Sequence, residues 1–119
     1  MFTIGQVARE VGVNIGAIRF YERKGLLEPA IRSEQNNRLY SELDLKWLNF
    51  IKCLRETGMS VDDIKDYHDL VKVGTDTLPE RIRLIQEQKQ KLLDDIAYKQ
   101  SQLVHLEEKL VRYYNGENY

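Results

Sequence analysis

The C-terminal segment, residues 77–119, constrains the fold most strongly, because it repeats apolar residues every seven positions. Two seam positions recur with the spacing of a coiled coil. The first contains Ile82, Lys89, Ile96, Leu103 and Leu110, and the second contains Ile85, Leu92, Lys99, Leu106 and Tyr113. One helix of this length would extend roughly 50 Å, and no other segment is long enough to cover it. We therefore predict a dimerisation helix that pairs with a second copy of the chain.

Residues 1–40 contain short helical patterns that are interrupted by glycines. The first pattern begins with the spacing Thr3-x-x-Gln6, which is typical of a capping box. The second, at about residues 15–24, follows Asn14, a favourable N-cap, and ends at a glycine. Two short helices joined by a glycine-containing turn predict a helix-turn-helix.

A β-hairpin, or wing, is predicted after these helices. The segments 30–32 and 38–40 have extended character, and polar residues separate them. Asn36 and Asn37 tolerate positive φ and suit the tip of the hairpin.

Two further helices are predicted between the wing and the dimerisation helix. Ser41 and Ser60 each stand three positions before an aspartate, and both begin an apolar stripe. The first stripe is Leu43, Trp47, Phe50, Ile51 and Leu54, and the second is Val61, Ile64, Tyr67, Leu70 and Val71. The predicted fold is mostly α: a winged helix-turn-helix domain with a linking helix pair over residues 1–76, and a dimerisation helix over residues 77–119.

Charge and cysteine content restrict the possible functions. The net charge is −1, but residues 1–40 carry a small basic surplus, which is compatible with nucleic-acid binding without establishing it. The single cysteine excludes an intrachain disulfide and a cysteine-rich metal site within one chain. No apolar run approaches the ~20 residues that span a bilayer, and no signal segment is visible, so we expect a cytoplasmic protein without membrane contact. No cofactor and no catalytic constellation of an enzyme is predicted.

The second predicted helix, NIGAIRFYERKG, has residues available for a partner. Ile15, Ile18 and Tyr21 are expected to face inward. The residues left toward solvent or a partner are Asn14, Ala17, Arg19, Phe20 and Arg23. The Arg19 guanidinium can bind a phosphate or a guanine edge through two hydrogen bonds. An ordinary amphipathic helix with a charged face would show the same pattern, so the residues alone leave both interpretations open.

The sequence IRFYERKGLL, followed by Pro29, Arg32 and RLYSELDL, resembles the N-terminal domain of the MerR family of transcription regulators. The later segment KCLRETGMSVDDIKDY resembles the continuation of that family, so the resemblance covers residues 1–73. It implies a homodimer whose long helices pack antiparallel. It also implies that the dimer bends and untwists double-stranded promoter DNA, which realigns the promoter elements for RNA polymerase.

By position, the resemblance implies DNA contacts from the recognition helix and from the wing. The implied set is Asn14, Ala17, Arg19, Phe20, Tyr21, Arg32, Arg38 and Tyr40. The chain departs from the family pattern in the wing, where Asn36-Asn37 replaces the usual Gly-Tyr and removes an aromatic contact. Asn14 replaces a common Ser as an equivalent cap, and Ala17 replaces a common Thr and so removes a hydroxyl contact.

The stretch FIKCLRE contains the lone cysteine, Cys53. It resembles the subgroup, often named AdhR or NmlR, that responds to aldehydes, other electrophiles or oxidants through one cysteine. Helical spacing places Cys53 at the flank of the predicted stripe, roughly 100° from its centre, and turns Lys52 and Arg55 away from the thiol. A cysteine that packs as a small apolar residue is the alternative interpretation.

Two alternative functions remain at this point. One is a MerR-like regulator with a non-covalent effector or none, in which Cys53 is structural. The other is a coiled-coil protein-interaction module, which would not need the paired R-F-Y-E and R-x-Y motifs. Metal-sensing relatives carry Cys or His ligands near the end of the long helix, where this chain offers only His105. His105 and His68 are therefore expected at the surface or between helices rather than at a metal.

Overall fold

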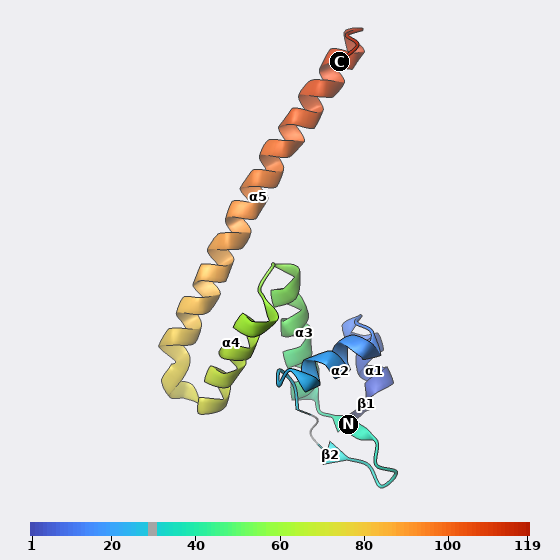
Figure 1. Ribbon diagram of the computed structural model, residues 1–119, viewed down its shortest axis with the longest axis vertical. Coiled ribbons are helices and arrows are strands. Elements are labelled where there is room, and N and C mark those ends of the chain that lie inside the picture. The colour runs from blue at the N-terminus through green and yellow to red at the C-terminus, as the bar shows by residue number, and fades with distance from the viewer. Residues whose placement is uncertain (29–30) are drawn as a thin grey trace. The chain divides into compact units, whose positions relative to one another are not determined.

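The computed structural model describes residues 1–28 and 31–119, and its contacts divide the chain into two compact units, Met1–Arg81 and Ile82–Tyr119. The mostly helical architecture, with a helix-turn-helix, a small wing and a long C-terminal helix, confirms the predicted fold class (Figure 1). The elements are β1 (Phe2–Thr3), α1 (Ile4–Val11), α2 (Ile15–Arg23), β2 (Ile31–Arg32), β3 (Arg38–Tyr40), α3 (Glu42–Glu56), α4 (Val61–Val73), the 3-10 helix η1 (Thr75–Thr77) and α5 (Leu78–Tyr114). Pro29 and Ala30, which entered the sequence analysis, lie outside the described residues.

Side-chain caps begin the helices at the predicted residues. The Thr3 hydroxyl oxygen accepts a hydrogen bond from the Gln6 backbone N–H at 3.2 Å, and the Gln6 side chain accepts one from the Thr3 N–H at 2.9 Å. Ser41 and Asp44 form the same reciprocal pair at the beginning of α3. The Asn14 side chain accepts a hydrogen bond at 2.7 Å from the N–H of the third residue of α2. These bonds satisfy donors that the first helical turn leaves unpaired, so short sequence motifs set where the helices begin.

The wing belongs to a three-stranded antiparallel sheet with the order β1-β3-β2. Phe2 lies opposite Tyr40, and Ile31 lies opposite Leu39. The strand β1 was not expected, because two residues are too few to show the alternation that indicates a strand. β3 is the central strand, so whatever fixes β3 also places its two neighbours.

The tip of the wing depends on one residue with a left-handed backbone. Asn36 has φ +64°, as the sequence predicts, and among the described residues other than glycine it is the one with positive φ. The prediction therefore holds for Asn36 but not for Asn37. The Arg32 guanidinium donates a hydrogen bond to the Asn36 carbonyl at 3.0 Å, which ties β2 to the turn.

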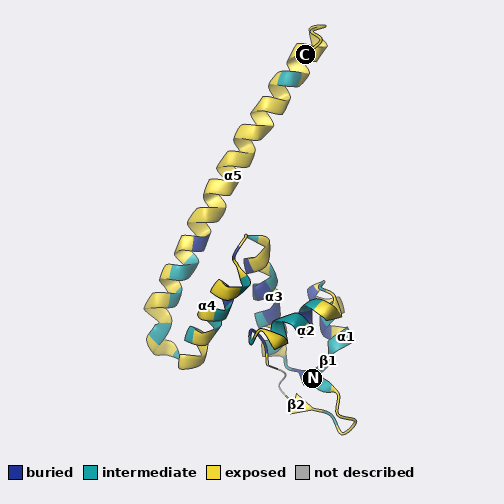
Figure 2. Ribbon diagram, in the orientation of Figure 1, coloured by how far each residue is buried: buried dark blue, intermediate teal, exposed yellow. Residues whose placement is uncertain are grey.

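The core of the unit Met1–Arg81 lies among α1, α2, α3, α4 and the inner face of the wing (Figure 2). Its fully buried residues include Val7, Ile18, Leu26, Tyr40, Leu48, Ile51 and Ile64. Three predictions of inward-facing residues are wrong: Ile15 and Val71 are each 36% exposed, and Leu43 is 75% exposed. Ile15 and Leu43 lie in the first turn of a helix, where Cα–Cβ bonds tilt toward the N-terminal end, so their side chains extend beyond the packed part of the helix. Val71 lies in the last turn of α4.

The buried face of α3 is centred on Ile51 because two elements pack on either side of it. On one side, the Lys52 amine donates a hydrogen bond to the carbonyl of Val11, the last residue of α1, at 3.0 Å. On the other side, Trp47 stacks with Tyr67 of α4 at a ring-centroid distance of 6.0 Å. Since α1 and α4 approach from different directions, the centre of the buried face is shifted from the position that the predicted stripe implies.

An aromatic cluster connects α3 and α4 to the segment that follows α2. The Trp47 indole N–H donates a hydrogen bond to the Leu26 carbonyl at 2.6 Å. The same indole stacks on His68, with centroids 4.9 Å apart and planes inclined by 19°. Trp47 therefore couples the helix pair to the helix-turn-helix by packing and by a hydrogen bond.

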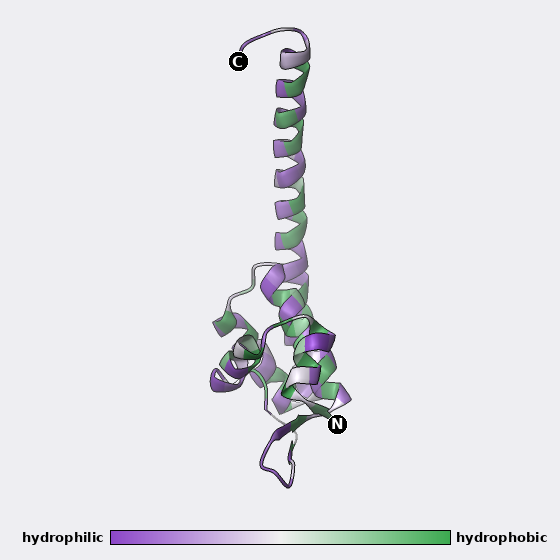
Figure 3. Ribbon diagram, turned by 90° about the vertical axis from the view of Figure 1, so that its right-hand side faces the viewer, coloured by the Kyte–Doolittle hydropathy of each residue, from purple (hydrophilic) through white to green (hydrophobic). Residues whose placement is uncertain are grey.

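The unit Ile82–Tyr119 is formed largely by α5, which has 37 residues in all. Hydrophobic residues recur turn after turn along this helix (Figure 3). Apart from Ile85, all apolar residues of the predicted seam are exposed, with Leu103 at 53% and Leu106 at 66%. Among the described residues, none of the helices has the length and apolar character that crossing a bilayer requires.

The surroundings of His68 disfavour its charged form. Burial, followed by the neighbouring Lys72 cation, lowers its pKa from the usual 6.5. Its Nδ1 atom is buried and has no hydrogen-bond partner within the described residues. The other charged groups that act on it are Asp69, Glu28 and Lys65. As the pH falls below about 6.5, the unfolded chain binds this proton before the folded chain does, so the free energy of unfolding decreases.

We therefore expect the free energy of unfolding, measured by urea titration, to fall below pH 6.5 with a His68 contribution of at most about 1.4 kcal/mol per pH unit. His68→Phe keeps a ring that can stack on Trp47 and should flatten this part of the profile. His105→Phe, at an exposed position of α5, serves as the control and should leave the slope unchanged. Identical slopes in the wild type and His68→Phe would contradict the assignment.

Candidate nucleic-acid interface

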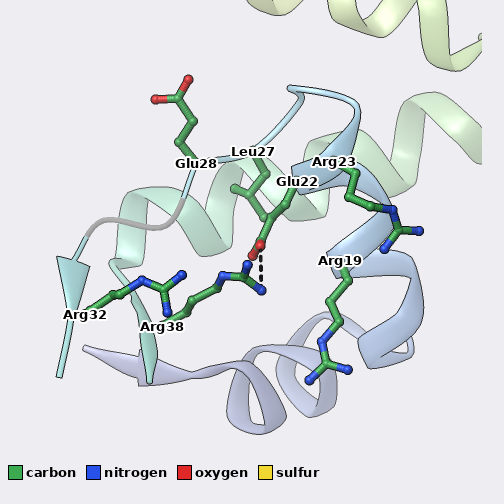
Figure 4. A pocket seen from close by; sticks show the side chains of 7 residues that line it. All are labelled: Arg19, Glu22, Arg23, Leu27, Glu28, Arg32 and Arg38. Atoms are coloured by element: carbon green, nitrogen blue, oxygen red, sulfur yellow. Dashed lines mark ion pairs between the residues drawn. The ribbon is translucent and has the colours of Figure 1, made fainter. Parts of the chain in front are cut away.

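Arginines from the recognition helix and the wing gather around two neighbouring hollows of about 510 and 340 Å³. The larger is lined by Arg19, Glu22, Arg23, Leu27, Glu28, Arg32 and Arg38 (Figure 4). The smaller is lined by Thr3, Ile4, Arg19, Arg32, Asn36, Asn37 and Arg38. Arg19, Arg32 and Arg38 line both, so cations from α2, β2 and β3 share one concave surface. A positively charged concavity of this kind attracts phosphate groups.

A buried carboxylate lies among these arginines. Glu22 of α2 forms an ion pair with Arg38 of β3, with 3.2 Å between the guanidinium nitrogen and the carboxylate oxygen. The Tyr40 hydroxyl donates a hydrogen bond to the other carboxylate oxygen. The Glu22 side chain is 8% exposed, whereas that of Arg38 is 38% exposed. Burial and the hydrogen bond to Glu22 raise the pKa of Tyr40, so the phenol stays protonated and remains a donor.

Tyr40 itself is not available to DNA, which corrects the expectation that it grips the phosphate backbone. Its side chain is fully buried, with 0% exposure, and its hydroxyl is directed to Glu22. The physical reason is its place on the central strand, where its ring packs into the core beneath the wing. Arg38, two residues earlier on β3, is on the same face of the strand as Tyr40 but is 38% exposed and lines the hollow.

The other predicted residues of α2 differ in their surroundings. Arg19 is exposed and lines both hollows. Phe20 is half-buried, with the Arg23 guanidinium 6.0 Å and the Lys24 amine 5.8 Å from the ring centroid. The ring of Tyr21, also half-buried, lies 5.9 Å from that of Phe20. Phe20 therefore holds two cations on the surface of the recognition helix.

The first turn of α2 contributes a cap and a small residue. The Asn14 side chain is used to cap the helix, as predicted. Ala17 is half-buried and has no polar group to offer. Neither residue lines either of the two hollows.

Glu22 was not among the predicted site residues, although it is central to this site. Glu22 and Tyr40 are eighteen positions apart, and no periodicity links them. The available signal was the motif pair itself, because Glu22 ends R-F-Y-E while Arg38 and Tyr40 form R-x-Y, but the motifs do not show that these side chains meet. Glu28 was also missed, since no sequence pattern links it to α4; it accepts a hydrogen bond from the Lys72 amine of α4 at 3.1 Å.

Cys53 lies on a different face of the unit Met1–Arg81 and is exposed. It follows Ile51, the centre of the buried face of α3, by two residues, which places it roughly 160° around the helix. The flank position expected from the sequence is thus corrected to the outer face. Lys52 is bonded to α1, and the Arg55 guanidinium donates a hydrogen bond to the Met59 carbonyl at 2.7 Å. As predicted, neither neighbouring cation is directed to the thiol.

Within residues 1–28 and 31–119, no cluster of three or more His, Cys, Asp or Glu side chains could hold a metal ion. His105 lies on α5 with Glu108 as its acidic neighbour, at 3.9 Å.

The helix-turn-helix, the sheet that carries the wing and the shared arginine surface define the class of winged helix-turn-helix DNA-binding proteins. Comparison with known proteins identifies the family. The family model for the MerR HTH family regulatory protein matches residues 2–70, and the model for MerR, DNA binding, matches residues 45–112. The chain belongs to the MerR family of DNA-binding transcription regulators.

Individual relatives agree with this assignment. An uncharacterised HTH-type transcriptional regulator of Haemophilus influenzae is 37% identical over 112 residues, which are 94% of this chain and 83% of that protein. The HTH-type transcriptional regulator AdhR of Bacillus subtilis is 36% identical over 91 residues, which are 76% of this chain and 65% of AdhR. The crystal structure of HiNmlR, a MerR family regulator lacking the sensor domain, was determined with bound promoter DNA. It has a TM-score of 0.86 and 36% identity, and the match covers 96% of this chain and 90% of that chain. These relatives are transcription regulators rather than enzymes.

Proposed function

We propose that the chain binds double-stranded promoter DNA as a homodimer and regulates transcription by distorting that DNA. The observation that carries the proposal is the shared surface of Arg19, Arg32 and Arg38, which belong to three different elements. Arginine forms paired hydrogen bonds with phosphates, and such contacts fix the orientation of a protein on the duplex. The DNA-bound structure of the relative HiNmlR supports this reading of the surface.

The proposed contacts follow the exposure of each side chain. Arg19, Arg32 and Arg38 bind DNA directly from the hollow. Phe20 and Tyr21 support the basic surface of α2 with their half-buried rings. Asn14 and Ala17 belong to the first turn of α2, where the backbone N–H groups of a helix favour a phosphate.

The proposed assembly is a dimer formed through α5. Exposed apolar residues along so long a helix call for a partner helix, and a second copy supplies the same heptad. By resemblance to the family, the two helices run antiparallel. In this proposal, residues 1–76 form the DNA-binding domain with its linking helix pair, and residues 77–119 form the dimerisation helix.

Bending a promoter costs about 1–6 kcal/mol, which the contacts of two DNA-binding domains can supply together. RNA polymerase is then affected through the distorted DNA.

We further propose that Cys53 senses electrophiles or oxidants. Cys53 is exposed, and the chain is similar to AdhR and HiNmlR and resembles the single-cysteine subgroup of the family. The thiolate would add to the electrophilic carbon of an aldehyde or quinone, whose π bond opens and whose oxygen takes a proton from water, or it would be oxidised to a sulfenic acid by hypochlorous acid, which releases chloride. The added group would occupy the outer face of α3. Lys52, the adjacent residue, bonds to the end of α1, so an adduct would arise next to a contact between the helix pair and the helix-turn-helix.

A second candidate is a regulator with a non-covalent effector or none, in which Cys53 has no sensing role. The observation that favours it is that Lys52 and Arg55 are both engaged by backbone carbonyls. Neither cation is therefore placed to stabilise a thiolate, and reactivity would depend on exposure alone.

For the DNA contacts, Arg19→Ala should weaken binding to the chain's own promoter region by roughly 5- to 150-fold, the loss expected for one good arginine contact of about 1–3 kcal/mol. Fluorescence anisotropy with labelled promoter DNA measures the change. Arg112→Ala removes the same charge from α5 and should bind like the wild type. Equal affinities for Arg19→Ala and the wild type would refute the proposed surface.

For the dimer, Leu103→Glu should yield monomers in multi-angle light scattering, because it places a charge in the proposed seam. Val104→Glu is the matched control: Val104 is adjacent and has similar exposure, at 50% against 53%. It lies outside the seam and should leave the dimer intact. A dimeric Leu103→Glu variant would show that the interface lies elsewhere.

For the sensor, Cys53→Ser should retain promoter binding but lose the transcriptional response to aldehydes, quinones or hypochlorite. The single cysteine makes the measurement direct, because intact-protein mass spectrometry should detect one adduct on the wild type and none on the variant. If Cys53→Ser responded like the wild type in transcription from its own promoter, the second candidate would replace the sensor proposal.

A further inference from the structure

The Glu22 carboxylate lies at a position that its negative charge makes unfavourable for DNA binding. It lines the same hollow as Arg19, Arg32 and Arg38, which is the surface proposed to receive DNA phosphates. A carboxylate in that position repels phosphate, so its charge by itself weakens DNA binding. Its burial adds a cost, because an ionised group with 8% exposure must be stabilised by partners. These two unfavourable effects suggest that Glu22 acts through the residues that it contacts.

Both contacts of Glu22 cross from the recognition helix to the central strand of the sheet. One carboxylate oxygen pairs with the Arg38 guanidinium at 3.2 Å, and the other accepts the hydrogen bond of the Tyr40 hydroxyl. Tyr40 is fully buried and cannot move without disturbing the core. The carboxylate is therefore held by a fixed donor on one side and holds a partly exposed arginine on the other.

Arg38 can still bind a DNA phosphate while it is paired with Glu22. A guanidinium has five N–H donors, and the ion pair with Glu22 uses one of its terminal nitrogens. The side chain is 38% exposed and lines both hollows. In Figure 4, the Arg38 guanidinium points to the Glu22 carboxylate, with Arg32 next to it on the wing.

We infer that Glu22 is a positioning residue for DNA binding: it fixes Arg38 against α2, so that the recognition helix and the wing present their arginines in one arrangement. The inference rests on the proposed DNA-binding function. A free arginine side chain samples many rotamers and must lose that freedom on binding, whereas a side chain that is already held loses less. The fixed geometry also sets the distance between Arg38 and Arg19, which belong to different elements.

The inference predicts a change in affinity opposite to the one that charge predicts. Glu22→Gln removes a negative charge from the hollow, so electrostatics alone predicts tighter binding. It also replaces the ion pair with Arg38 by at most a neutral hydrogen bond, which holds the guanidinium less firmly, so positioning predicts weaker binding, by about tenfold. Asp69→Asn is the matched control, because it removes the same charge from an exposed ion pair on α4 and should not weaken binding.

The experiment measures the affinity of the full chain for its promoter DNA by fluorescence anisotropy over a series of salt concentrations. Glu22→Gln and Arg38→Ala should each reduce the slope of log K against log salt by about one phosphate contact. In the Arg38→Ala background, Glu22→Gln should cause no additional loss, because its effect passes through Arg38. Equal or tighter binding by Glu22→Gln would overturn the inference, and so would losses that add in the double variant.

Tyr40→Phe keeps the test valid if Glu22→Gln does not fold, as judged by its circular dichroism melting curve. It removes one hydroxyl and retains the buried ring, so it should weaken binding in the same direction, again only when Arg38 is present. Failure of the proposed function has a different signature: the wild type would not bind promoter DNA, or Arg38→Ala would bind as tightly as the wild type. Loss of affinity in Arg38→Ala with none in Glu22→Gln or Tyr40→Phe would overturn the inference alone.

Discussion

A carboxylate that is almost completely buried requires donors around it, and in this chain that requirement joins the two parts of the DNA-binding surface. Glu22 belongs to the recognition helix, and both of its partners, Arg38 and Tyr40, belong to β3. Because β3 is the central strand, holding it against α2 also places β1 and β2. Arg32 and Arg38 lie opposite each other in the hairpin of β2 and β3, and this attachment brings them to Arg19 of α2 in one shared surface.

The helix α3 has the corresponding role for the rest of the unit Met1–Arg81. Trp47 donates a hydrogen bond to the Leu26 carbonyl and stacks on His68, while Lys52 bonds to the last carbonyl of α1. One helix thus contacts the helix-turn-helix at two points and α4 at a third. The proposed sensor, Cys53, lies on the uncovered side of this same helix. A group bound to Cys53 would therefore be attached to the helix that makes these contacts.

Features that depend on neighbouring residues could be predicted well. Thr3, Asn14, Ser41 and Ser60 begin helices where expected, because each cap bonds to a backbone N–H three residues later. The left-handed residue Asn36 was predictable because asparagine tolerates that conformation. Burial was predicted less well. Leu43 and Ile15 are exposed, Tyr40 is buried, and Cys53 is on the outer face, because burial depends on which elements pack against a helix and from which direction.

The sequence by itself determined the order and limits of the helices, the turn of the wing and the apolar seam of α5, since these follow from hydrogen bonds and periodicities within a few residues. The family also follows from ordered motifs such as IRFYERKGLL and RLYSELDL. Only the tertiary structure decided that Glu22 is buried, that Tyr40 supports the surface from beneath, and that Arg38 faces outward. These outcomes come from pairing residues sixteen to eighteen positions apart across an element boundary, where no local pattern specifies which side chains will meet.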